Sequence, residues 1–123
     1  MAWSFSSDRP VFIQLADILK KQIIAGKYAP SEQIPSVRQL AIDTAVNPNT
    51  VQRALTLLED EGLVESRGTL GRFVTSDLCA IQRCLDESAK SLVAQFIENA
   101  RKISMSDELI IEMIKEELNN DGT

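Results

Sequence analysis

Apolar residues in the first half of the chain recur at helical spacing. Positions three or four residues apart predict a first helix over about residues 10–25. The same spacing predicts a second helix that ends at about Thr44 and a third that ends at about Glu61. The apolar faces consist of Phe12, Leu15, Leu19 and Ile23 in the first helix, Val37, Leu40 and Ala41 in the second, and Val51, Leu55 and Leu58 in the third.

Polar residues mark the start of the second and third helices. Ser36 follows Pro35, and a serine hydroxyl can accept a hydrogen bond from a free N–H group of the first turn. Asn47 is also a good capping residue, and Pro48 suits the first helical position because an N–H group there has no helical partner. The two helices are therefore predicted to be joined by a tight turn.

Two β-prone runs follow the third helix, which Gly62 ends. Residues 63–66 and 72–75 contain branched and aromatic side chains, and the residues between them are Arg67-Gly68-Thr69-Leu70-Gly71. This pattern predicts a hairpin with a five-residue loop. Three helices followed by such a hairpin are the parts of a winged helix-turn-helix domain.

Beyond Asp77 the pattern becomes that of long amphipathic helices. Apolar residues continue at spacings of three and four for more than six turns of helix, up to Ile103. Ser104 or Ser106 can cap a last helix, and we expect residues 119–123 to fray. The predicted fold is mainly α with a small β-hairpin. It consists of a winged helix-turn-helix DNA-binding domain over residues 1–76 and a two-helix C-terminal dimerisation unit over residues 77–123.

The two C-terminal helices are too few to bury their own apolar stripes. A partner chain is the simplest cover, and most such assemblies are symmetric dimers. The candidate dimer interface consists of Leu78, Ile81, Leu85, Leu92, Phe96, Ile110, Met113 and Ile114. In the alternative arrangement, both helices fold back on the winged domain of their own chain.

The net charge of −5 is not spread evenly along the 123 residues. Residues 1–76 carry 8 basic and 8 acidic residues, whereas residues 77–123 carry 5 and 10. Within residues 36–53 and 67–72 the charged residues are Arg38, Arg53, Arg67 and Arg72, against Asp43 alone. Affinity for phosphate depends on local cations, so the acidic total does not argue against a focused basic surface.

The composition is that of an ordinary globular protein, with 44% apolar and 25% charged residues. No apolar run approaches the length of a membrane span. The N-terminus lacks the basic and hydrophobic regions of a signal peptide, so we expect a cytoplasmic location.

Little in the sequence suggests catalysis. The chain has no histidine, which removes the commonest general base and the commonest metal ligand. Cys79 and Cys84 lie about 140° apart around one predicted helix, so they neither form a disulfide nor share a metal. The remaining carboxylates are typical of solvated helix faces: Asp86, Glu87, Glu112, Glu116 and Glu117. An enzyme is the weakest interpretation, and no cofactor or metal site is predicted.

The start of the third helix carries polar side chains suited to the edges of bases. A helix in the major groove needs such residues in its first turns and an apolar face behind them. Asparagine and glutamine can pair with adenine, arginine with guanine or phosphate, and threonine with phosphate or a thymine methyl. The residues that project away from the apolar face are Asn49, Thr50, Gln52 and Arg53.

Further cations lie beside this helix in the predicted fold. Arg38 is near the start of the second helix, and Arg67 and Arg72 flank the hairpin loop, where Gly68 permits close backbone approach. Such a loop suits contact with the phosphate backbone or the minor groove. Each residue alone is more common as a surface charge or turn residue, and the fold also occurs in protein-binding modules. The order and spacing of the motifs together favour DNA.

These motifs resemble the N-terminal domain of GntR-family bacterial transcription regulators. The resemblance covers about residues 9–76. The segments that carry it are Pro10-Val11-Phe12-Ile13-Gln14-Leu15, Ile34-Pro35-Ser36-Val37-Arg38-Gln39-Leu40-Ala41, Val46-Asn47-Pro48-Asn49-Thr50-Val51-Gln52-Arg53-Ala54 and Gly71-Arg72-Phe73-Val74. Two segments depart from the family pattern. Pro30-Ser31-Glu32 stands where Pro-Gly is usual before an acidic residue, and two residues rather than one separate Gly68 from Gly71.

The resemblance implies a DNA-binding regulator. The matching positions imply contacts with double-stranded operator DNA from Ser36, Arg38, Asn49, Thr50, Gln52 and Arg53, and from the wing around Arg67 and Gly68. The short helical tail is similar to the YtrA subfamily, whose tails form dimers and whose members often regulate transporter operons. A homodimer that represses from a near-palindromic operator is therefore expected. Whether a small-molecule effector binds is left open by the sequence.

Overall fold

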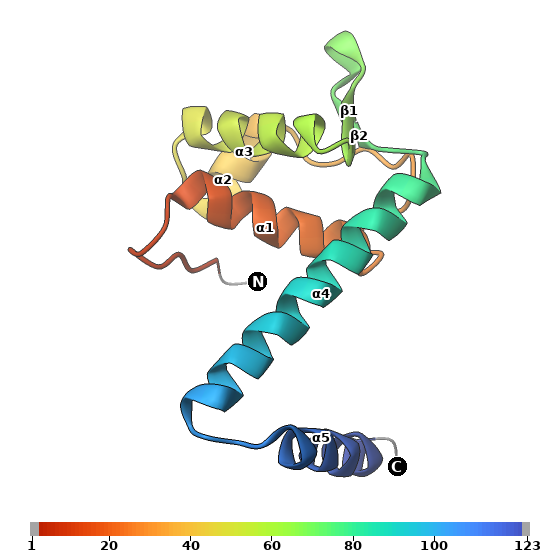
Figure 1. Ribbon diagram of the computed structural model, residues 1–123. Coiled ribbons are helices and arrows are strands. Elements are labelled where there is room, and N and C mark those ends of the chain that lie inside the picture. Colours follow the sequence, from red (N-terminus) through yellow and green to blue (C-terminus); the bar gives the residue numbers. More distant parts are fainter. Residues whose placement is uncertain (1–2, 122–123) are drawn as a thin grey trace. The chain divides into compact units, whose positions relative to one another are not determined.

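The computed structural model describes residues 3–121, and its elements follow the predicted order (Figure 1). Three helices come first, then a two-stranded antiparallel hairpin, then two further helices. Their bounds are α1 Val11–Ile24, α2 Val37–Thr44, α3 Pro48–Asp60, β1 Val64–Ser66, a 3₁₀ turn Gly68–Leu70, β2 Arg72–Val74, α4 Leu78–Lys102 and α5 Asp107–Asp121. The mainly helical fold with one hairpin is therefore confirmed.

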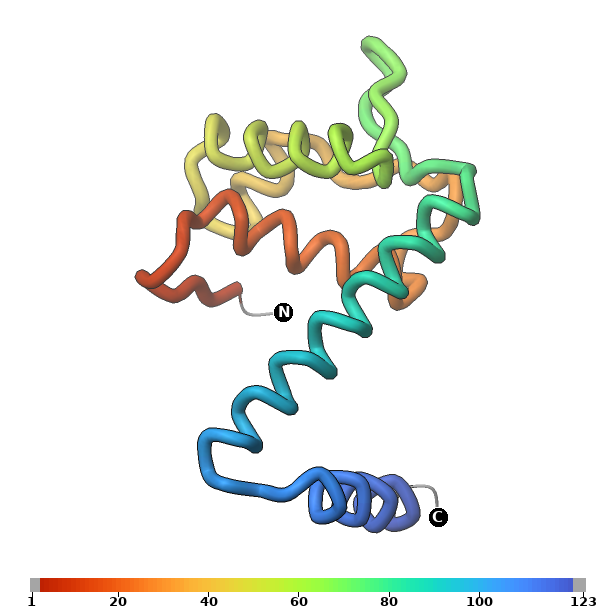
Figure 2. Tube along the Cα trace, viewed as in Figure 1, coloured from red at the N-terminus to blue at the C-terminus, as the bar shows by residue number. Residues whose placement is uncertain are grey.

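The contacts of the chain form two units that divide within α4, between Leu85 and Asp86. In the first unit, α1 packs along α3, and α2 packs on α3 (Figure 2). The hairpin completes this core with Val64 and Val74, and Leu63 just before β1 also belongs to it. Most of the helix residues that the spacing predicts to face inward are fully buried: Leu15, Leu19, Leu40, Val51, Leu55 and Leu58. Phe12, Val37 and Ala41 are only partly buried, and Ala16 and Ala54 are buried although the spacing did not single them out.

Side-chain caps fix the start of α2 and of α3. The backbone N–H of Gln39 donates to Ser36 Oγ at 3.1 Å, and the backbone N–H of Asn49 donates to Asn47 Oδ1 at 2.7 Å. Between the two helices, Ala45 adopts the left-handed conformation with φ 57°. The predicted caps and the tight turn are therefore confirmed. At both helix starts a side chain thus satisfies a backbone N–H that has no partner within the helix.

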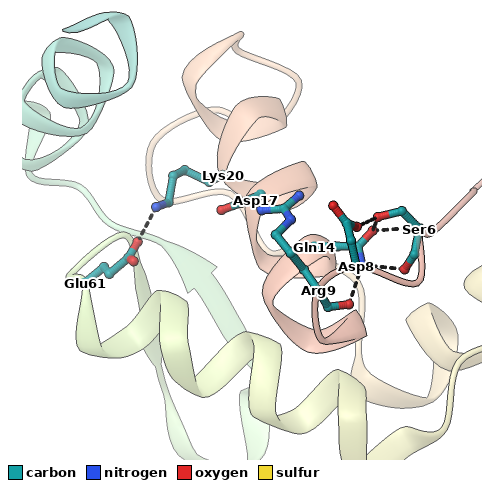
Figure 3. A network of polar contacts seen from close by, with 7 residues as sticks. All are labelled: Ser6, Asp8, Arg9, Gln14, Asp17, Lys20 and Glu61. Carbon is teal, nitrogen blue, oxygen red and sulfur yellow. Dashed lines mark hydrogen bonds and ion pairs between the residues drawn. The ribbon is translucent and has the colours of Figure 1, made fainter. Parts of the chain in front are cut away.

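Gln14 joins the segment before α1 to the body of the first unit (Figure 3). Its side chain is almost fully buried, and its Nε2 donates to the backbone carbonyls of Ser6 and Arg9 at 2.9 and 2.7 Å. Its Oε1 accepts from the backbone N–H of Ser6 at 2.8 Å. One amide thus satisfies three backbone groups, which holds the segment against α1.

An ion pair connects α1 to the residue that follows α3. Lys20 Nζ lies 2.9 Å from a carboxylate oxygen of Glu61, as Figure 3 shows. Burial disfavours the charged lysine, but the hydrogen bond and charge of Glu61 outweigh it, so the pKa of Lys20 is raised. The pair supplements the apolar contact between the two helices.

The second unit consists of the remainder of α4 and of α5. Ala100 and Ile110 are buried in it, and Ser106 Oγ accepts from the backbone N–H of Leu109 at 3.2 Å. Ser106 therefore caps α5, and Ser104 lies in the preceding turn with φ 67°. Residues 119–121, where we expected fraying, belong to α5. Residues 122 and 123 lie outside the described residues.

We expect Gln14→Leu to lower the free energy of unfolding by about 1–3 kcal/mol, because three backbone groups lose their partner. Gln22→Leu on the same helix is the matched control. The Oε1 of Gln22 is buried and has no hydrogen-bond partner among the described residues, so this change should be neutral or stabilising. Urea unfolding measures both, and equal losses would contradict this account of Gln14.

Candidate nucleic-acid interface

The polar face of α3 is open to solvent because its apolar face is fixed in the core. Val51, Ala54, Leu55 and Leu58 are fully buried, which turns the opposite side of the helix outward. Asn49, Gln52 and Arg53 are exposed, and Thr50 is half-buried. The structure thus places these four predicted residues on the first two turns of one helix, around its free N-terminal end.

Two of the four predicted arginines are paired with carboxylates. Arg67 Nη2 lies 3.6 Å from a Glu65 oxygen, and Arg72 forms an ion pair with Glu59. In the described part of the chain, the guanidinium groups of Arg38 and Arg53 form no hydrogen bond or ion pair. Those two arginines therefore keep their full donor capacity for a ligand, which the charge pattern alone did not reveal.

Arg38 lies on α2 beside the start of α3. It borders a shallow groove of about 490 Å³ that is otherwise lined by apolar residues and Pro48. Ser36 is exposed just before it, and its hydroxyl accepts a hydrogen bond from Gln39, so its cap and any DNA contact would share one oxygen. The predicted contacts on α2 therefore lie close to the N-terminal end of the exposed α3 face.

Arg72 connects the wing to α3. It lies on β2, and its partner Glu59 lies in the last turn of α3. Both side chains are largely shielded from solvent. Such a pair is screened less than a surface pair and fixes the angle at which the hairpin leaves the helix. A contact between Arg72 and DNA stays a prediction, and the ion pair gives this arginine a structural role.

The loop of the wing is braced at its base. Gln33 Nε2 donates to the carbonyl of Leu70 at 2.7 Å, and Gln33 also pairs with Phe73 as an isolated bridge beside β2. The backbone N–H of Arg67 donates to the carbonyl of Gly71 at 2.8 Å. Within the loop, Gly68 has φ 58° and Leu70 is 67% exposed. The predicted five-residue loop is therefore ordered by a residue from outside the hairpin.

Sequence reasoning missed Gln33 and Glu59. Neither belongs to a recognisable motif, because both are ordinary polar residues whose partners lie far along the chain. Arg67 also has a partner that its spacing did not indicate, since its Cζ lies 4.4 Å from the centroid of the Phe73 ring. The wing arginines thus serve the hairpin itself as well as any ligand.

Ser31 takes the backbone conformation that glycine usually supplies in this turn. Its φ is 68°, and its N–H donates to the carbonyl of Val74 at 3.0 Å. The backbone N–H of Glu32 closes the turn on the carbonyl of Ala29. The departure from Pro-Gly therefore leaves the left-handed turn in place, at some cost in strain.

Much of the predicted dimer surface is uncovered within its own unit. In the second unit, Leu92, Phe96, Met113 and Ile114 are exposed, whereas Ile110 is buried. The other three predicted positions belong to the first unit. Leu78 and Leu85 are exposed there, and Ile81 packs against the core of that unit. The expectation of an intermolecular interface is not tested by these contacts.

The fold and the exposed helix define a winged helix-turn-helix, and comparison with known proteins gives its family. Residues 13–74 match the family model described as bacterial regulatory proteins, gntR family. The uncharacterised transcriptional regulator YhcF of Bacillus subtilis is 31% identical over 90% of this chain and 92% of its own length. The transcriptional repressor YtrA of the same organism is 34% identical over 58% of this chain and 55% of its own.

Solved structures agree with this assignment. A GntR family transcriptional regulator from Listeria monocytogenes has a TM-score of 0.85 and 30% identity, covering 91% of this chain and 98% of its own. The DNA-binding domain of AraR in complex with operator ORX1 has a TM-score of 0.54 and 26% identity, covering 61% and 92%. The chain belongs to the GntR family of transcription regulators. Within residues 3–121, no helix combines the length and apolar character needed to cross a membrane.

We expect Gly71→Ala to destabilise the wing. Gly71 has φ 109° and ψ −157°, a region that only glycine adopts readily, and an added Cβ would lie 2.8 Å from Gln33 Nε2. The expected loss in the free energy of unfolding is about 1–3 kcal/mol. Gly68→Asn is the control, because φ 58° is tolerated by asparagine and the space around Gly68 is open. Urea unfolding measures the free energy of unfolding of both variants. A larger loss for Gly68→Asn than for Gly71→Ala would contradict the strain and close contact assigned to Gly71.

Proposed function

We propose that the protein represses transcription as a homodimer that binds a near-palindromic operator. The observation that carries this proposal is the exposed polar face of α3, flanked by two arginines that have no carboxylate partner among the described residues. Polar side chains with free donors on the first turns of a supported helix are what the major groove requires. Family membership supports the same role.

The proposed contacts divide by their chemistry. Asn49 and Gln52 carry amides that can pair with adenine edges, and Thr50 can contact phosphate or a thymine methyl. Arg38 on α2 and Arg53 on α3 supply positive charge near the α3 N-terminal turns, and Ser36 is proposed to add a contact with the DNA backbone. The wing around Arg67 and Gly68 is proposed to contact the phosphate backbone or the minor groove. Arg72 contributes chiefly by holding the wing through Glu59.

The second unit is proposed to form the dimer. Nine large apolar side chains of the described part of the second unit are exposed: Leu92, Val93, Phe96, Ile103, Leu109, Ile111, Met113, Ile114 and Leu118. A unit of this size does not keep so much apolar surface in water without a partner. A two-fold axis through it would present two copies of α3 to two half-sites of one operator.

Repression would follow from occupancy of the promoter. One relative is named as a transcriptional repressor. The resemblance of the helical tail to the YtrA subfamily motivates the proposal that the target encodes a transporter. Such a protein acts in the cytoplasm, where bacterial DNA is located. A transporter ATPase gene adjacent to the gene for this chain would support the proposed target.

Gln52→Ala should weaken operator binding by about 1–3 kcal/mol and relax the preference at one base pair of each half-site. The assay is fluorescence anisotropy with a duplex from the region upstream of its own gene and with single-base variants of that duplex. Gln95→Ala, an exposed glutamine of the second unit, is the control and should leave affinity unchanged. If wild-type protein shows no salt-dependent, sequence-dependent binding, a winged-helix module that binds protein becomes the better interpretation.

Leu92→Glu should convert the dimer to monomers, because it places a charge on an apolar side chain proposed to lie in the interface. Gln95→Glu adds the same charge at a neighbouring exposed polar position of α4 and should leave the dimer intact. Sedimentation equilibrium at several protein concentrations measures the result. Unchanged association of the Leu92 variant would remove this residue from the interface.

A further inference from the structure

Arg53 is stacked on an aromatic ring of another helix. Its Cζ lies 4.0 Å from the centroid of the Phe12 ring in the first turn of α1. Phe12 is half-buried and also packs against the core of the first unit. A guanidinium over an aromatic face gains a cation–π attraction and loses rotational freedom. The arginine is thus held to one side of α3.

We propose that Phe12 is the positioning residue for Arg53, and that the stack directs this arginine to a backbone phosphate rather than to a base edge. The proposal rests on the proposed function, because it assigns a role within the DNA contact. It assigns different roles in DNA binding to two neighbouring residues of α3, Gln52 and Arg53. Arg53 sets affinity for any duplex, and Gln52 supplies sequence preference.

The two flanks of α3 support this separation. Successive helix residues diverge by about 100°, and residues seven apart share a flank. Gln52 therefore lies on the same flank as Glu59, which pairs with Arg72 of the wing. Arg53 instead lies towards α1, over Phe12. To contact a base edge, the guanidinium would have to leave the ring and turn back across the exposed face of α3.

The chemistry of the stack suits a phosphate. Stacking uses the flat face of the guanidinium, so the five N–H donors, which lie in its plane, stay available at its edges. None of them is used by a carboxylate or carbonyl in residues 3–121. Planar, preorganised donors match the oxygens of a phosphate in a bidentate contact. Less side-chain entropy is then lost on binding than for a free arginine.

The stack can be tested without DNA. In the NMR spectrum of the full-length protein, the Nε–H resonance of Arg53 should be displaced by the ring current of Phe12. Phe12→Leu should abolish the displacement, and Phe12→Tyr should keep it because the aromatic face remains. Phe5→Leu, which removes another half-buried aromatic residue packed on the same core, is the matched control for general loss of packing. An Arg53 resonance that Phe12→Leu leaves in place overturns the stack.

Binding to two duplexes tests the role. One covers the region upstream of its own gene, and the other has the same length and base composition in shuffled order. Arg53→Gln should weaken binding to both by a similar factor, on the order of tenfold, and should lower the salt slope by about one. Phe12→Leu should weaken both in the same way but less, and the double variant should be no weaker than Arg53→Gln alone.

The outcomes separate this inference from the proposed function. If Arg53→Gln weakens binding to the upstream duplex alone, the arginine contacts a base and the inference is overturned. If Phe12→Leu binds like the wild type while Phe5→Leu does too, Phe12 positions nothing. If wild-type protein binds neither duplex, the proposed function itself fails, and the DNA role of both residues fails with it.

Discussion

The packing of α3 on α1 is the contact on which the rest of the DNA-binding unit depends. Leu15 and Leu19 of α1 and Val51, Leu55 and Leu58 of α3 are fully buried, and each such side chain contributes about 1.5–3 kcal/mol. Because this face of α3 is fixed, its other face must point to solvent. The same two helices also bring Phe12 beneath Arg53 and Lys20 beside Glu61. The packing of the apolar face of α3 in the core therefore also sets the orientation of its polar face.

The wing is attached to this frame by few, specific contacts. Arg72 pairs with Glu59, and Gln33 donates to the Leu70 carbonyl. A hairpin with two three-residue strands is not stable alone, so these contacts decide where the loop lies. The exposed loop can thus be presented in one place even though little of it is buried. The positive charge of Arg72 is partly neutralised by Glu59 in the ion pair that holds the wing.

The second unit differs from the first in how little apolar surface it buries. It buries little of its own apolar surface, with Ala100 and Ile110 as its buried apolar residues among those described. The ion pair between Arg101 and Asp107 is highly exposed and contributes little by itself. Stability of this unit is therefore expected to come from association, which would couple folding, dimerisation and operator binding in one protein.

The sequence by itself determined the elements and their ends. Helical spacing, the caps Ser36 and Asn47, and the glycine-bearing loop are local signals, so all three were predicted correctly within one or two residues. The conformation of Ser31 and the choice of Ser106 as the cap of α5 were settled only in the structure. Tertiary structure also decided the partners of the arginines, because folding brings Glu59 of α3 to Arg72 of β2 and Phe12 of α1 to Arg53 of α3. Charge and spacing in the sequence indicate which kinds of side chain lie on a surface. The partners of those side chains depend on distances between residues, and only the packing of the helices and strands determines these distances.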